Sequence, residues 1–346
     1  MTSPSTGVSL HRFRRRRQSL EKPDQHGRML RLIAQEWHDQ LTLTRHLVTP
    51  GDRSAFYAEV KAGAFVRVCR GAYVPRDVWE TASGDARYRL KVNAAAALSR
   101  DDLLLSHYSA AVLWRLPLIG PWPARVHTTT SASRGGFSNR HIIRHAQDLS
   151  SDIQQIDGLK VTGLARTVID MATACSFASA VTVADAALRR TQYPLAGLPN
   201  TSISREDLIR EAGSLALRHS TAKVRRVIEF ADGAADRPGE SVSRVSMFAA
   251  GIAPPELQAP LRGASGKQYF VDFWWPQFNV IGEFDGKDKY QNPAFLRGRT
   301  PEQALYDEKL REDDLREAGH GMVRWKWSVA CSPRLLAAKL YRAGVR

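Results

Sequence analysis

The chain has few cysteines, and none of them is placed for a paired role. Cys69, Cys175 and Cys331 are its 3 cysteines among 346 residues. Their odd number and wide spacing predict neither a disulfide framework nor a cysteine-ligated zinc site. We therefore expect three reduced cysteines with no special chemistry.

Long apolar runs are also missing. No stretch reaches the roughly eighteen consecutive apolar residues from which a membrane-spanning helix is recognised. The basic run from His11 to Arg17 leads into Gln18-Ser-Leu-Glu-Lys-Pro23, whereas a secretory signal would continue into an apolar stretch. These absences predict a cytoplasmic protein with no membrane partner.

Acidic residues are scarce relative to basic ones. The chain has 50 Lys and Arg against 35 Asp and Glu, a formal net charge of +15. Such a balance favours polyanionic partners, since neutralised phosphates release their counterions. DNA is the partner we expect. The 43% hydrophobic content is enough for two or three cores, so the fold class predicted is multidomain α/β (α+β).

The N-terminal part has the pattern of helices followed by a hairpin. Leu30, Ile33, Trp37 and Leu41 recur at helical spacing, and a second short helix is expected to end at Thr49-Pro50-Gly51. A third helix, capped by Asp52, is predicted to run to Lys61. The runs Phe65–Cys69 and Ala72–Val74, joined by Arg70-Gly71, predict a β-hairpin.

This order of elements indicates a winged helix-turn-helix module over 28–76. Its third helix would enter the major groove of DNA, and the hairpin would form the wing. The expected DNA contacts are Arg53, Tyr57 and Lys61 on the helix and Arg67 and Arg70 on the wing. A small helical module with a solvated basic face remains the alternative. The basic segment 1–27 is predicted to be a disordered tail that either touches phosphates or only solubilises the chain.

A central αβ domain is expected over 77–190. Helices are predicted at Arg87–Leu98 and Ser106–Leu113, strands at Ala124–Thr129 and Arg140–His145, and a further helix from Thr162. Arg166 and Asp170, four apart, are expected to pair on the surface of that helix. No partner at metal-ligand spacing accompanies His107, His141 or His145, which predicts packing or solvated roles for them. Proline, glycine and serine in 191–239 predict a helical linker.

Three short motifs carry a resemblance over roughly residues 30 to 190. They are Arg70-Gly-Ala-Tyr73, Leu105-Ser-His-Tyr-Ser-Ala-Ala111, and Gly158-Leu-Lys-Val-Thr162 followed by Ala165-Arg-Thr-Val-Ile-Asp170. Together they resemble the antitoxins of type IV, abortive-infection (AbiEi-like) toxin-antitoxin systems. The resemblance implies a winged helix that binds promoter DNA, a domain that supports repression or toxin neutralisation, and a cognate toxin protein as a partner.

An antiparallel hairpin is predicted in the C-terminal part, over 240–346. Strands are expected at Lys267–Trp275 and from Val280 onward, separated by the turn Pro276–Asn279. If Trp275 pairs with Val280, the same register sets Asp272 opposite Glu283. Like charges on opposed strand positions, about 4.5 to 5.5 Å apart, are destabilising, so something should compensate them.

A hard divalent cation would resolve that repulsion, which predicts Mg²⁺ or Mn²⁺ as the cofactor. Mg²⁺ is commonly held by one or two carboxylates together with waters and substrate phosphate. We expect Asp272, Glu283 and Asp285 to ligate it, with Glu240 completing or orienting the shell and Lys287 stabilising developing charge. Together these five residues form the predicted catalytic centre.

Further downstream, a helix is expected over Glu302–Ala318 and a strand over His320–Trp327. Arg311 on the helix and Arg324 on the strand either form salt bridges or contact DNA phosphates. The tryptophans of this region, Trp274, Trp275, Trp325 and Trp327, are expected in the core rather than stacked on bases.

Five motifs in this region carry a second resemblance. They are Glu240-Ser-x-x-Arg244, Val271-Asp-Phe273, Gly282-Glu-Phe-Asp-Gly-Lys-x-Lys-Tyr290, Glu308-Lys-Leu-Arg-Glu-Asp313 and Val323-Arg-Trp325. They resemble the very-short-patch-repair (Vsr-like) proteins of actinobacterial type, within the restriction-endonuclease-like superfamily. The resemblance implies an αβββαβ core and metal-dependent DNA cleavage. The usual superfamily motif has acid-x-lysine on the second strand, and here Asp285 stands where the lysine would be.

Three hypotheses follow from the sequence. The first is a metal-dependent DNA endonuclease that the N-terminal module delivers to its substrate. The second is a noncatalytic type IV antitoxin or transcriptional regulator that binds promoter DNA. The third, compatible with the second, makes the acidic pair a structural salt-bridge cluster with Arg244 or Arg311. The oligomeric state is not indicated by the sequence.

Overall fold

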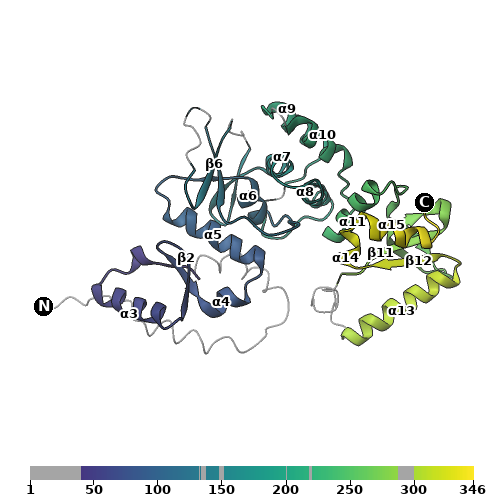
Figure 1. Cartoon of the computed structure of the whole chain (residues 1–346), viewed down its shortest axis with the longest axis horizontal. Helices are drawn as coiled ribbons and strands as arrows, with labels where there is room; N and C mark the ends of the chain where they lie inside the picture. Colours follow the sequence, from purple (N-terminus) through teal and green to yellow (C-terminus); the bar gives the residue numbers. More distant parts are fainter. Residues whose placement is uncertain are drawn as a thin grey trace.

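The computed structural model of the chain describes residues 40–131, 133, 138–147, 152–199, 201–217, 220–286 and 300–346. These residues form three sheets, each from its own part of the chain, with helices packed on them (Figure 1). The predicted mixed α/β, multidomain class is confirmed. The basic tail (1–27), the first predicted helix up to Trp37, and Lys287 lie outside the described residues. In the described part of the chain, no helix has the length and apolar character needed to cross a membrane.

The first sheet carries one helix followed by a hairpin. Its strands pair antiparallel in the order β1-β3-β2. Phe56 is the buried side chain of the helix and makes edge-to-face ring contacts with Phe65 and Tyr73. The third helix and the hairpin predicted from the sequence are thus confirmed. The elements are β1 (Thr42–Leu43), α3 (Pro50–Lys61), β2 (Phe65–Cys69) and β3 (Ala72–Pro75).

Two details of this module differ from the prediction. Asp52 does not cap α3, because Thr49 is the N-cap and its hydroxyl accepts from the Asp52 N–H at 3.1 Å. The Asp52 carboxylate accepts in return from the Thr49 N–H at 3.4 Å, which completes a capping box. Pro50 suits the first helical position, where its missing N–H costs nothing. Before Thr49 the described residues contain β1 and the 3₁₀ turn η2 (Thr44–His46) in place of the second predicted helix.

The central sheet has five strands in the order β6-β5-β4-β8-β7. The predicted helices and strands of this domain are confirmed within a few residues at their ends. Its helix α5 belongs to two cores, since Tyr88 and Val92 pack under the central sheet while Ala94 and Leu98 pack against the N-terminal hairpin (Figure 1). The elements are α4 (Arg76–Thr81), α5 (Gly84–Leu98), β4 (Leu104–Leu105), α6 (His107–Leu113), β5 (Val126–Thr130), β6 (Ile142–Ala146), β7 (Ile153–Ile156), β8 (Leu159–Thr162), α7 (Leu164–Ala174) and α8 (Phe177–Arg189).

Segment 191–239 adds two helices to this central core. Helix α9 (Arg205–Ser214) contributes Leu208, and helix α10 (Thr221–Phe230) contributes Val224 and Val227. All three side chains are buried in the same hydrophobic cluster as α7 and α8. The two helices therefore stabilise the central domain as well as leading to the C-terminal one.

The C-terminal domain is a four-stranded sheet in the order β12-β11-β10-β9, with helices on both faces (Figure 1). One hydrophobic cluster joins the sheet to α11, α14 and α15, and a second joins it to α13 through Leu315. Up to β12 the elements follow one another as helix, three strands, helix and strand. They are α11 (Pro238–Ala249), β9 (Glu256–Arg262), β10 (Gln268–Trp275), η5 (Pro276–Phe278), β11 (Val280–Phe284), α13 (Pro301–Glu317), β12 (Gly321–Trp325), α14 (Trp327–Ala330) and α15 (Pro333–Arg342).

The predicted hairpin register is confirmed where the two strands pair. Trp275 pairs with Val280, and the ladder continues to Phe273 opposite Gly282. Strand β9 was not predicted, because its sequence lies in a stretch rich in proline and glycine. Its proline is tolerated since β9 is the edge strand of the sheet. The last predicted strand is too long by one residue at its start and two at its end, where Trp327 begins α14.

Candidate carboxylate centre and nucleic-acid surface

Glu240 is a buried carboxylate near the start of α11. Only 1% of the residue is exposed, and its Oε2 accepts hydrogen bonds from the Asp236 N–H at 2.9 Å and from Gln258 Nε2 at 3.0 Å. Burial and the nearby Asp272 carboxylate raise the pKa of Glu240 to about 8. Ionisation of one carboxylate therefore disfavours ionisation of the other, and the pKa of Glu240 stays well above its ordinary value.

Asp272 lies where the regular alternation of β10 breaks. Val271 packs in the cluster under α13 and Phe273 in the cluster under α11, although residues two apart on a regular strand share a face. The neighbouring strand is irregular at the same level, since Gln258 has a φ of 48°. At this break Asp272 reaches across to β11, where its Oδ2 accepts from the Phe284 N–H at 2.9 Å. The irregular backbone thus directs this carboxylate toward the end of β11.

Glu283 is neutralised by two arginines from different elements. Arg311 on α13 holds it with both guanidinium nitrogens, at 2.6 Å and 3.2 Å, and Arg324 on β12 lies at 3.4 Å. Burial alone would lower the pKa of Arg311, but the carboxylates around the guanidinium raise that pKa above its ordinary value. Glu308 joins the cluster through Arg324 at 2.6 Å. The salt-bridge role expected as one alternative for Arg311 and Arg324 is confirmed.

The predicted opposition of Asp272 and Glu283 is therefore relieved by arginines. The β10–β11 ladder ends one pair short of these residues, and each carboxylate has partners of its own. Arg244, the other arginine considered for this cluster, instead binds Asp185 on α8 at 2.8 Å and the Phe230 carbonyl at 2.7 Å. Its role is to join the central and C-terminal domains.

Asp285 directly follows β11 and is half-buried. Its N–H donates to the Trp325 carbonyl at 2.8 Å, which extends the β11–β12 pairing by one step. Strand alternation directs the side chain of Asp285 to the same side as that of Glu283. The predicted site residue Lys287 lies outside the described residues.

The donor set suits a hard cation only in part. Within the described ranges, no three His, Cys, Asp or Glu side chains come together as a group able to hold a metal ion. Glu240 and Asp272 are two carboxylates, the number that Mg²⁺ needs from a protein when water and phosphate supply its other ligands. The residues present therefore fit Mg²⁺ or Mn²⁺ bound together with a substrate, with Gln258 orienting Glu240.

The tryptophans of this domain are mainly structural. Trp275 and Trp325 are buried and donate their indole N–H groups to the Ala253 carbonyl at 2.7 Å and to Ser243 Oγ at 2.8 Å. The core role predicted for these two side chains is confirmed. The core prediction was wrong for Trp327, which is 44% exposed at the start of α14.

The predicted DNA contacts of α3 share its exposed side. Arg53, Tyr57 and Lys61 are all exposed, although the Tyr57 ring also contacts the rings of Phe56 and Tyr73. Arg53 Nε donates to the Leu47 carbonyl at 3.0 Å, which leaves its outer nitrogens available to an anion. This surface combines two cations with an aromatic ring.

The two predicted wing arginines lie in different surroundings. Arg67 is exposed in the middle of β2. Arg70 is at the hairpin turn, which packs on α5: a Cβ at Gly71 would contact Leu98 at 3.5 Å. The turn end of this hairpin is therefore held against the central domain and does not project freely.

Three histidines from separate elements converge in the central domain, which the sequence did not predict. The rings of His107 and His145 stack with centroids 3.6 Å apart, and His127 Nδ1 lies 3.0 Å from His145 Nε2. Burial, and then the neighbouring imidazoles, lower the pKa of His127 to about 3, so the ring is neutral. Helix α6 and strands β5 and β6 supply these residues, and no spacing in the sequence could have indicated their contact.

The Arg166–Asp170 pair, predicted for a helix surface, is buried. The guanidinium Nε lies 2.9 Å from the carboxylate, and the two side chains are 1% and 3% exposed. The prediction was wrong about location because α9 packs on α7, where Glu211 lies 3.9 Å from Arg166 and Gln147 accepts from it at 2.7 Å. Asp170 also lies 3.4 Å from His107 Nδ1, which links the ion pair to the histidines.

Comparison with known proteins relates part of this chain to a mycobacterial protein. No family model matches the sequence. An uncharacterized protein of Mycobacterium tuberculosis, recorded for strains CDC 1551 / Oshkosh and ATCC 25618 / H37Rv, is 29% identical over 155 residues. The match covers 44% of this chain and 54% of the relative, so the chain spans about half the length of the curated relatives it matches. Because the relative is itself uncharacterized, the similarity assigns no activity to this chain.

Proposed function

We propose that the chain is a DNA-binding protein whose C-terminal domain is a metal-dependent endonuclease that hydrolyses phosphodiester bonds. The observation that carries the proposal is the pair Glu240 and Asp272. A buried carboxylate with its pKa raised to about 8 is costly to keep, and such groups concentrate at functional sites. Among the residues that the structure describes, no lysine, arginine or histidine forms an ion pair with Glu240.

A divalent cation explains that arrangement. Asp272 and Glu240 would hold Mg²⁺, and the chemistry that such an ion supplies is an activated water and a polarised scissile phosphate. Glu240 would hold the cation as a carboxylate, with its proton released to water, and Gln258 and the Asp236 N–H hold that carboxylate in place. Asp285, at the end of β11, is proposed to complete or orient the ligand set. Lys287 remains proposed to stabilise developing charge.

Glu283 is proposed to support the site and not to bind the metal ion. Its two arginines already balance its charge, so a metal ion would have to displace them. We assign Glu283 to positioning: with Arg311 and Arg324 it holds β11, β12 and α13 together beside the carboxylate pair. Arg311 and Arg324 are correspondingly proposed as supports of the site, not as direct phosphate contacts.

The N-terminal module is proposed to bring the protein to DNA. It supports this role with α3, whose exposed side carries Arg53, Tyr57 and Lys61, and with Arg67 on the adjacent strand. A net charge of +15 favours the same partner. The helix-and-hairpin order agrees with a winged helix, in which such a helix lies in the major groove.

A noncatalytic role is favoured by one different observation. Glu283 is paired with arginines and Asp285 replaces the lysine of the usual motif, which together leave the centre short of two groups that cleavage employs. In this second candidate the chain is a type IV antitoxin or transcriptional regulator that binds promoter DNA and a cognate toxin. Its nuclease-like domain would then serve only as a scaffold.

Cleavage of supercoiled plasmid DNA in Mg²⁺ or Mn²⁺ tests the proposal. The parent protein should nick or linearise the plasmid, chelation should stop the reaction, and Asp272→Asn should abolish it. Asp313→Asn removes an exposed carboxylate from α13 and is the matched control, which should cut as the parent does. Activity that survives Asp272→Asn would refute the site, and metal-independent DNA binding without any cleavage would favour the second candidate.

A further inference from the structure

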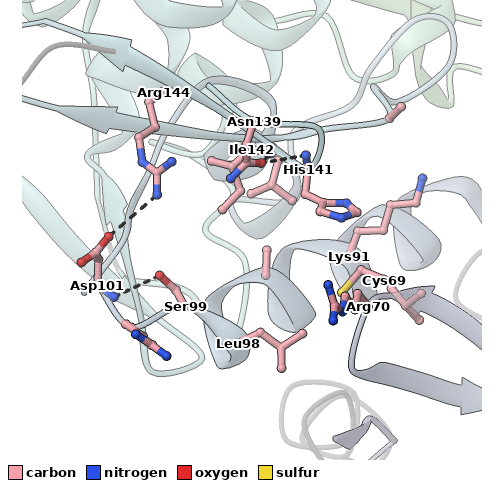
Figure 2. A pocket seen from close by; sticks show the side chains of 15 residues that line it. Cys69, Arg70, Lys91, Leu98, Ser99, Asp101, Asn139, His141, Ile142 and Arg144 are labelled. Carbon is pink, nitrogen blue, oxygen red and sulfur yellow. Dashed lines mark hydrogen bonds and ion pairs between the residues drawn. The ribbon is translucent and has the colours of Figure 1, made fainter. Parts of the chain in front are cut away.

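The connection between the central and C-terminal domains runs along the end of α8. Residues 231–237 lie between α10 and α11, and α8 packs on α11 (Figure 1). A Cβ at Gly233 would lie 3.1 Å from the backbone of Leu188 and Arg189, so the absence of a side chain lets the two stretches of backbone come close. This junction is separate from the hollow of about 420 Å³ between the N-terminal hairpin and the central sheet, to which β2, α5 and β6 contribute (Figure 2).

Two charged side chains of α8 hold this connection. Asp185 and Arg189 are four residues apart, so they share one face of the helix. The buried Asp185 carboxylate accepts from the Asp232 N–H at 2.7 Å and also binds Arg244 of α11 at 2.8 Å. The Arg189 guanidinium lies 2.5 Å from the Asp236 carboxylate. The connection is thus fixed to the central domain at two points, one on each side of Gly233.

The Arg189 side chain is itself held in place. Its guanidinium lies over the Tyr193 ring, 4.2 Å from the ring centroid, and only 22% of the side chain is exposed. Solvent and salt screen a partly buried ion pair less than an exposed one. Arg210 and Asp207 form an exposed pair for comparison, within α9, in which 74% of the arginine side chain is exposed.

The same connection holds Glu240. The Asp236 N–H donates to Glu240 Oε2 at 2.9 Å, and the Glu240 N–H donates to the Arg237 carbonyl at 2.9 Å. The residue whose carboxylate binds Arg189 therefore also fixes, through its backbone, the carboxylate of the proposed centre. A path of direct contacts runs from α8 through Asp236 to Glu240.

We infer that α8 of the central domain belongs to the carboxylate centre, with Arg189 and Asp185 as positioning residues that act on Glu240 through the connection. Partners that orient metal ligands commonly change metal affinity or activity by about 10- to 100-fold when they are removed. The centre is then complete only while the two domains are docked, so their contact controls it. The consequence for metal binding rests on the proposed function, whereas the path from Arg189 to Glu240 does not.

Hydrogen–deuterium exchange of the full chain, without metal or DNA, tests that path. Arg189→Met should speed exchange of the Asp236 N–H at least about tenfold, because the residue loses its anchor on α8. Arg189→Lys keeps the cation and should restore the protection of this N–H. Asp236→Asn breaks the same ion pair from the other side and serves as a second variant if Arg189→Met is poorly folded. Arg210→Met breaks the exposed pair on α9 and should exchange as the parent does.

The amides of β10 and β11 should keep the exchange rates of the parent, which separates a local change from general destabilisation. In the presence of a DNA duplex, Arg189→Met should also weaken Mn²⁺ binding at least about tenfold, and Arg189→Lys should recover it. Unchanged exchange of the Asp236 N–H in both Arg189→Met and Asp236→Asn would overturn the inference, as would parental Mn²⁺ affinity in a variant whose exchange is faster. If the parent itself binds no Mn²⁺, the proposed function fails, and the exchange rates still decide whether α8 positions Glu240.

Discussion

Replacing Glu240 with glutamine should stabilise the protein at alkaline pH, and the effect can be worked out from the surroundings of this carboxylate. Its pKa is raised from an ordinary value of 4.5 to about 8 by burial and by Asp272. The folded protein therefore keeps a proton that the unfolded chain releases, so the stability that Glu240 contributes falls as pH rises from about 4.5 to about 8. The glutamine in Glu240→Gln cannot ionise, so this variant does not lose that stability as the pH rises.

The size of the effect follows from the same values. Each pKa unit corresponds to about 1.4 kcal/mol of free energy. The rise in the pKa of Glu240 from 4.5 to about 8 therefore sets an upper limit of roughly 5 kcal/mol on the stability lost at alkaline pH. We expect the free energy of unfolding of Glu240→Gln to exceed that of the parent by a few kcal/mol at about pH 9 and to match it within about 1 kcal/mol at about pH 5.

Urea denaturation at the two pH values, without divalent cations, measures this difference. Glu317→Gln changes an exposed glutamate on α13 and should follow the parent at both pH values. Other titrating groups, such as Asp185, are common to both proteins and cancel in the comparison. An equal stability difference between Glu240→Gln and the parent at pH 5 and pH 9 would refute the raised pKa and the close approach of Asp272.

Three further changes test other parts of the structure. Arg311→Met leaves the buried Glu283 with one arginine among the described residues, Arg324, and should lower the free energy of unfolding by about 3 kcal/mol in urea titrations. A loss below about 0.5 kcal/mol would show the Arg311–Glu283 pair to be unimportant. Gly282→Ala places a Cβ 2.7 Å from the Trp325 ring, and overpacking of this kind costs about 1 to 3 kcal/mol. The melting temperature should therefore fall by several degrees, and an unchanged melting temperature would contradict the close approach of Trp325 to Gly282. Arg53→Ala should weaken duplex binding and reduce the salt dependence by about 0.9 in the log–log slope, and an unchanged slope would remove α3 from the interface.

The hairpin register of the C-terminal domain could be predicted from the sequence. A short turn between Trp275 and Val280 left one alignment, and the structure has that alignment. Periodicity likewise placed α3 and the N-terminal hairpin, because their apolar positions recur at spacings typical of a helix and of strands. Features that depend on neighbouring residues in the chain were therefore accessible.

Features that depend on distant residues were not. The sequence predicted that Glu283 needs a compensating charge and offered a cation, Arg244 or Arg311 as its source, but it could not show that Arg311 and Arg324 together supply it from α13 and β12. Gln258 was missed because its strand contains a proline and its side chain reaches Glu240 across the fold. The partners of the site residues thus depend on tertiary packing that the local pattern does not encode.

Binding of Mn²⁺, followed by the loss of its free electron paramagnetic resonance signal, tests the carboxylate pair most directly. The parent protein should bind Mn²⁺ in the presence of a DNA duplex, and Asp272→Asn and Glu240→Gln should each weaken that binding at least about tenfold, because each removes one of two anionic ligands. Glu283→Gln should retain it, since Arg311 already balances that charge. Binding that is lost in Glu283→Gln but kept in Asp272→Asn and Glu240→Gln would contradict the proposed centre.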